Sequence, residues 1–216
     1  MNFRTIFDCF DRADQKLAIL TQSGYLAVSP LAGRIVAIAL AENEESLFYI
    51  NPEITDTERL RTVPEQLVAG PGGGRLRYAP EYAYAWGSAV PDVENFSNYG
   101  VQTNEDPGTF TMVEMSDGVN LRTDTSLVDK RTGKAVAFSV ERRVSPINSP
   151  IDDLSTGVRF AGYRLDQSVT IKHPEKGQQV DLWCILQMPI GTTLIVPTRE
   201  RPEPLSYFNQ GNWVVE

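Results

Sequence analysis

The chain has 216 residues and a mass of 24.0 kDa. This length is enough to bury a substantial core, and we expect one domain spanning residues 1–216. Lysine and arginine number 20 against 28 aspartates and glutamates, which gives a net charge of −8. An acidic chain is a poor partner for nucleic acid or an anionic membrane, because both attract basic surfaces.

Cysteine and histidine are too few for most metal centres. With two cysteines and one histidine, no zinc or iron–sulfur ligand set can be built, and we expect no metal and no cofactor. No apolar run reaches the ~18 residues of a membrane helix, and the first residues lack the apolar core of a signal peptide. The default expectation is therefore a soluble, cytoplasmic protein.

Two segments carry helical patterns. In the first, apolar residues recur at intervals of three and four, at Phe3, Ile6, Phe7 and Phe10. This spacing predicts a short packing helix within residues 1–14. A second short helix is expected within residues 55–67, with Thr55 or Asp56 as its cap and Pro64 as a stop or kink.

The rest of the chain has the pattern of short strands. Runs rich in Val, Ile, Leu and Tyr alternate with turn signals, such as Asp117-Gly118 between two runs. We expect strands at residues 16–21, 25–29, 34–40, 46–50, 109–115, 119–128, 135–144, 161–173, 180–188 and 192–196. About a dozen antiparallel strands in two packed sheets, with one or two short helices, are typical of an all-β sandwich.

Two of these runs allow their faces to be assigned. Residues 161–173 alternate apolar and polar side chains, which predicts one buried face and places His173 in phase with it as a partly buried side chain. Residues 180–188 carry large apolar groups on both faces, so this strand is expected in the centre of a sheet. Cys184 lies in that run, and we expect it to be an inert core thiol with no disulfide bond to Cys9.

The segment "GGGRLRYAPE" at residues 72–81 carries the strongest functional signal. In an extended chain Arg75 and Arg77 point to one side, where their planar forks suit hydroxyls or carboxylates. Nearby aromatic rings at Tyr78, Tyr82, Tyr84 and Trp86 supply flat apolar faces. Saccharides need both kinds of group, so this segment is a candidate saccharide site. The alternative is a core hairpin in which Arg75 or Arg77 pairs with Glu81.

Two other regions could contribute to the same site. On the strand at 180–188, Asp181, Trp183 and Gln187 share a face, so a carboxylate, an indole and an amide could line one surface. His173 and Asp181 are the candidate acid/base groups, and no residue is identified as catalytic. The site expected from sequence comprises Arg75, Arg77, Glu81, Trp183 and Gln187.

The same segment resembles a known family. "GGGRLRYAPE" is similar to the motif of aldose-1-epimerase-type, galactose-mutarotase-like proteins, in particular an uncharacterised bacterial branch. Residues 26–40 resemble the opening hairpin of that family, and residues 180–197 resemble its strand-turn-strand with a Trp and a Gln. The resemblance implies a β-supersandwich with a sugar-binding cleft. The chain is short for a complete domain of that family, so we expect either a trimmed sandwich or one whose C-terminal part is missing. Mutarotases use a histidine as acid and a late glutamate as base. This chain departs from that pattern, because His173 is its single histidine and the glutamate would lie beyond the second large sheet.

Two classes of function follow. The first is a carbohydrate-recognising, mutarotase-like β-sandwich, either a binding protein or an enzyme acting on carbohydrate as an epimerase, lyase or hydrolase. The second is a non-catalytic structural or partner-binding β-sandwich with a vestigial cleft. The side chains that face the widest concave surface discriminate between them.

Overall fold

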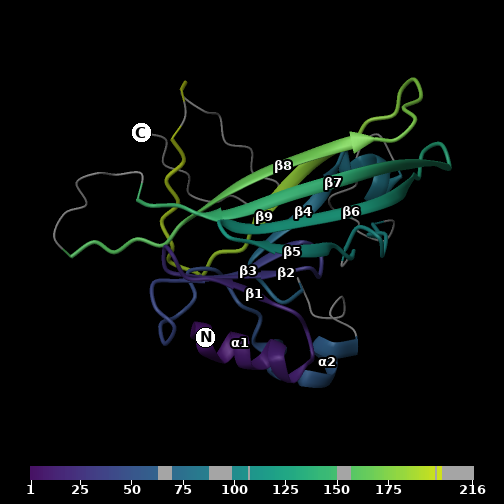
Figure 1. The fold of residues 1–216 in the computed structure, drawn as a ribbon. Helices are drawn as coiled ribbons and strands as arrows, with labels where there is room; N and C mark the ends of the chain where they lie inside the picture. Colours follow the sequence, from purple (N-terminus) through teal and green to yellow (C-terminus); the bar gives the residue numbers. More distant parts are fainter. Residues whose placement is uncertain (63–69, 88–98, 107, 150–156, 198, 201–216) are drawn as a thin grey trace.

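Two antiparallel sheets and a layer of short helices make up the structure, a computed structural model (Figure 1). It describes residues 1–62, 70–87, 99–106, 108–149, 157–197 and 199–200. The helices cover the outer face of one sheet, and the second sheet packs on its inner face. The all-β, two-sheet sandwich expected from the turn spacing is confirmed.

The first sheet has five strands in the order β1-β2-β3-β4-β9. These are β1 (Ala18–Leu20), β2 (Tyr25–Ser29), β3 (Arg34–Ala39), β4 (Gly74–Ala79) and β9 (Asp181–Leu186). Strands β3 and β4 meet at the single pair Ile35↔Gly74, whereas β4 and β9 pair along six residues. The β4–β9 ribbon therefore extends well beyond its junction with β3.

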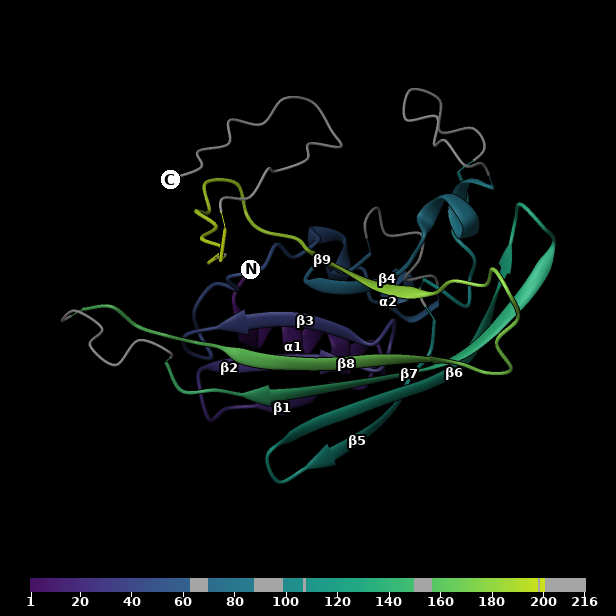
Figure 2. The same ribbon diagram turned by 90° about the horizontal axis from the view of Figure 1, so that it is seen from above.

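The second sheet is a meander in the order β5-β6-β7-β8. Its strands are β5 (Thr111–Met115), β6 (Gly118–Asp129), β7 (Lys134–Pro146) and β8 (Tyr163–Ile171). The predicted hairpin closes through Ser116-Asp117, with Met115 paired to Gly118. The long strands β6 and β7 curve at one end (Figure 2), where Lys130 N donates to Ala83 O at 2.9 Å.

The main core lies between the sheets. Alternation along β8 works as predicted, since Tyr163, Leu165, Val169 and Ile171 pack on this core while Arg164 and Thr170 are exposed. Burial of apolar surface supplies the driving force at ~25 cal/mol per Å². A second cluster joins the helices to β2 and β3, and Phe3, Ile6 and Phe10 are buried in it.

Polar side chains cap the first turns of both α-helices in the helical layer. Helix α1 (Phe3–Arg12) begins after Asn2, whose side chain accepts from Thr5 N at 2.8 Å. A 3₁₀ turn, η1 (Pro52–Thr55), precedes α2 (Thr57–Thr62). At the start of α2, Asp56 accepts from Arg59 N at 3.1 Å, so Asp56 is the cap. Pro64 lies outside the described residues. A single π-helical turn, η3 (Tyr82–Trp86), follows β4.

Three strand predictions are wrong. The run at 180–188 forms an edge strand, β9, because Trp183 and Leu186 remain 38% and 49% exposed and nothing in the described chain pairs beyond them. Residues 46–50 form no strand, and their single bridge, from Ile50 to Gly72, is isolated. Residues 192–196 are exposed and form no strand, so apolar composition alone misplaced them. Nine strands, rather than about a dozen, occur in the described residues.

None of the helices in the described ranges combines the length and apolarity needed to cross a membrane.

Candidate functional site on the face of β4 and β9

The glycines before β4 allow two backbones to approach closely. Gly72 and Gly73 have φ of +100° and +78°, which favours glycine. A Cβ on Gly73 would lie 2.3 Å from Ile35 O, and one on Gly72 would lie 2.3 Å from Tyr49 O. The predicted close approach is therefore made to the chain's own backbone, and it seats β4 in the sheet.

The alternation in β4 places its two arginines on the predicted common face. Leu76 and Tyr78 point into the main core, so Arg75 and Arg77 point to the opposite face of the sheet. In the register of β4 and β9, Arg77 lies opposite Trp183. Directly opposed residues on antiparallel strands project to the same face, so Arg77 and Trp183 share it.

Arg77 is the centre of a buried ion-pair network. Its Nε donates to Glu105 Oε1 at 2.6 Å, and its Nη2 donates to Tyr99 Oη at 2.9 Å and to Glu81 Oε1 at 3.2 Å. Tyr99 in turn donates to Glu81 at 2.9 Å. The side chains of Arg77 and Glu105 are 3% and 0% exposed. The alternative of an arginine paired with Glu81 is thus realised by Arg77.

Burial and charge act in opposite directions on this pair. Burial alone lowers the pKa of Arg77, but the charge and hydrogen bond of Glu105 outweigh it, so the pKa of Arg77 is raised. Burial raises the pKa of Glu105, and the nearby Arg77 compensates only in part. Glu105 Oε2 has no hydrogen-bond partner in the described part of the chain. The carboxylate depends on Arg77 for its charge.

Arg75 pairs with a different acid. Its Nη1 donates to Asp106 Oδ2 at 3.2 Å, and Arg34 Nη2 lies 3.7 Å from Asp106 Oδ1. Arg34 also donates to Gly72 O at 2.7 Å. Asp106 therefore bridges two arginines. Three guanidinium groups and the three carboxylates of Glu81, Glu105 and Asp106 cancel in charge across the whole network.

Most of the predicted aromatic faces are in the core. Tyr78, Tyr84 and Trp86 are at most 8% exposed, so they cannot stack on a ligand. Tyr82 lies under the guanidinium of Arg131, whose Cζ is 4.9 Å from the ring centroid. Trp183 is different, because its 38% exposed indole lies on the surface.

The remaining predicted residues lie in different places, two of them on or just after β9 and the third, His173, on the other sheet. Asp181 is exposed on the same face of β9 as Trp183, two residues away, and its carboxylate accepts from Leu182 N at 2.7 Å. Gln187 follows β9, where its backbone bonds to Gly73 O at 3.0 Å and to Tyr49 N at 2.8 Å. His173 belongs to the other sheet, in an exposed turn after β8 with φ of +51°. The chain leaves the strand at Ile171, so the prediction of a partly buried His173 is wrong.

Four members of the network were missed from the sequence, namely Arg34, Tyr99, Glu105 and Asp106. Tyr99, Glu105 and Asp106 come from a polar stretch without periodicity, which gives no spatial information. One signal was present: Arg77 lies between two core-facing residues on a strand, so its charge needed a buried acid.

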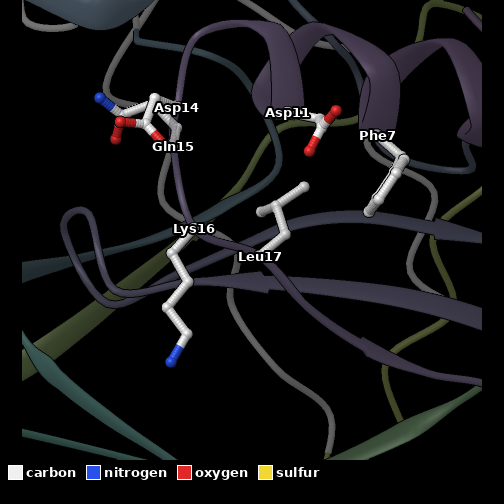
Figure 3. A pocket seen from close by; sticks show the side chains of 6 residues that line it. All are labelled: Phe7, Asp11, Asp14, Gln15, Lys16 and Leu17. Atoms are coloured by element: carbon white, nitrogen blue, oxygen red, sulfur yellow. The ribbon is translucent and has the colours of Figure 1, made fainter.

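A hollow of about 340 Å³ lies away from these residues, between α1 and the start of β1 (Figure 3). Its lining is Phe7, Asp11, Asp14, Gln15, Lys16 and Leu17, which mixes apolar groups with both charges. Within the described ranges, no three histidines, cysteines or carboxylates cluster closely enough to hold a metal ion. Comparison of the chain with protein-family models, with curated proteins and with solved structures gave no significant match.

Proposed function

We propose that the face of β4 and β9 binds a saccharide, in a sandwich that resembles the galactose-mutarotase-like proteins. The observation that supports this is the exposed indole of Trp183 directly opposite Arg77, beside a fixed set of hydrogen-bonding groups. An indole offers an apolar face to sugar C–H groups, and charged groups hold hydroxyls by strong hydrogen bonds.

The network leaves polar atoms near the surface. The side chains of Glu81, Arg75 and Asp106 are 26%, 19% and 18% exposed. Each is already held by an internal partner, so little side-chain entropy is lost when a ligand binds. Asp181 adds an exposed carboxylate on the same face of β9. Binding is supported more strongly than catalysis, because His173 lies on the other sheet.

A specific observation favours the second class of function. The guanidinium groups of Arg75 and Arg77 are engaged with Asp106, Glu105, Glu81 and Tyr99, as in a network that fastens residues 99–106 to β4. A structural sandwich with no ligand would use the same bonds. The two functions differ in the role of Trp183, which contributes little to stability if it is a ligand platform.

Calorimetric titration with neutral saccharides and uronic acids, as monomers and oligomers, tests the proposal. At least one should bind, and Trp183→Ala should weaken it at least tenfold without lowering the melting temperature. Leu186→Ala is the matched control, since it removes an exposed apolar side chain from the other face of the same strand. If no saccharide binds, or if both variants bind equally, the proposal is wrong and the structural function stands.

A further inference from the structure

Arg142 is buried without a carboxylate. It comes from β7, is 1% exposed and lies between the two sheets. Its Nη1 donates to Gly33 O, and among the described residues its Nε has no hydrogen-bond partner. In the described part of the chain it forms no ion pair, unlike Arg34, Arg75 and Arg77. A buried charge is costly unless an opposite charge compensates it.

A cysteine thiol lies close to the guanidinium group of Arg142. Arg142 Nη2 lies 3.8 Å from Cys184 Sγ on β9. Burial lowers the pKa of Arg142, and Cys184 is the first of the neighbours that act to raise it. Cys184 also donates to Gln167 Oε1 on β8 at 3.2 Å, so the sulfur bridges the edges of the two sheets. It is only half-buried, so small molecules can reach it.

We propose that Cys184, beside the buried guanidinium of Arg142, is a reactive thiol that hydroperoxides oxidise. Within the described residues the buried guanidinium has no carboxylate partner, and a cation beside a cysteine favours the deprotonated sulfur that attacks a peroxide. This proposal differs from the prediction of an inert core thiol, because the sequence did not show that Arg142 faces the same core. The site is independent of saccharide binding, since Cys184 lies opposite Leu76 on the core side of β9.

The reaction is a two-electron oxidation. The thiolate sulfur attacks one peroxide oxygen, an S–O bond forms and the O–O bond breaks. The leaving alkoxide or hydroxide takes a proton from water, which yields an alcohol or water. The product is the sulfenic acid of Cys184, which a second thiol can reduce through a disulfide. Arg142 stabilises the negative charge on sulfur before the attack.

The experiment measures the rate of Cys184 alkylation by iodoacetamide at pH 7 in a Cys9→Ala background, where it is the only thiol. The native protein should react at least threefold faster than the same chain unfolded in urea, despite partial burial. Arg142→Met should slow the native reaction at least tenfold. Gln167→Ala, a change at an exposed residue that removes an acceptor of the neutral thiol, should speed it severalfold. Hydrogen peroxide followed by dimedone should add one sulfenic-acid label at Cys184.

Each result of these experiments either supports or overturns the proposal. A native rate at or below that of the unfolded chain overturns the proposal, as does an Arg142→Met variant that folds and keeps the native rate. If Arg142→Met does not fold, the native-to-unfolded ratio and the Gln167→Ala variant decide the question. Absence of a dimedone adduct, with rapid alkylation retained, refutes the peroxide step.

Discussion

Replacing Arg77 by methionine should strongly destabilise the fold. The substitution keeps an apolar stem of similar length but leaves Glu105, with 0% of its side chain exposed, without its partner at 2.6 Å. Removing one member of a buried pair costs about 3–5 kcal/mol, because an uncompensated charge remains inside. In a chain of this length 1 kcal/mol moves the melting temperature by ~2–4 °C, so a fall of ~6–20 °C is expected.

Urea unfolding, followed by tryptophan fluorescence, measures this cost. Its pH dependence has a definite sign. Burial raises the pKa of Glu105, and loss of Arg77 raises it further, so the native variant binds a proton that the unfolded chain has released. The variant's deficit should therefore be largest at neutral pH and shrink toward pH 4, as Glu105 becomes neutral in both states.

The matched control is Arg122→Met. Arg122 faces Glu141 across β6 and β7 at 3.6 Å, with 57% and 54% of the two side chains exposed. An exposed pair contributes about 0–1 kcal/mol. The double variant Arg77→Met, Glu105→Gln should recover part of the loss, because the buried charge is gone. Equal costs for the Arg77 and Arg122 variants, or strict additivity in the double variant, would refute the reasoning.

Three further outcomes are expected. Gly73→Ala should cost several kcal/mol, clearly more than Gly177→Ala in the same denaturation assay, since both have positive φ but only the first places a Cβ against backbone. Val169→Asp should destabilise by several kcal/mol and Thr170→Asp by less than ~0.5, because only Val169 faces the core; equal values would contradict the face assignment. Burial raises the pKa values of Tyr84 and Tyr163 to about 12, so absorbance at 295 nm should show late phenol ionisations, one of which Tyr84→Phe removes. The contribution of the neutral Tyr84 phenol to stability is complete below pH 10 and is lost as pH rises through 12.

Local patterns predicted the strands whose two faces differ. Residues 161–173 alternate because one face of β8 packs on the core, and the hairpin at Asp117-Gly118 follows from its turn chemistry. The prediction that residues 180–188 form a central strand was wrong for a physical reason. Apolar groups on both faces suit a central strand, yet β9 is an edge whose Trp183 stays exposed.

Only the part of the site that lies on β4 and β9 could be predicted from the sequence. The spacing of Arg75 and Arg77 placed both on one face of β4, and the register with β9 added Trp183. Their partners Glu105 and Asp106 come from a stretch without period, whose position depends on tertiary contacts. The contact between Arg142 and Cys184 could not be predicted either, because the two residues are far apart in sequence and belong to strands of different sheets.

The most direct test of the saccharide site is the indole N–H signal of Trp183 in a ¹⁵N–¹H correlation spectrum, identified by its loss in Trp183→Phe. During titration with a saccharide that binds, this signal should shift in a saturable way with the calorimetric Kd, while the signal of Trp86, which is 8% exposed, stays in place. A saccharide that binds and leaves the Trp183 signal unmoved would contradict the assignment of the site to the face of β4 and β9.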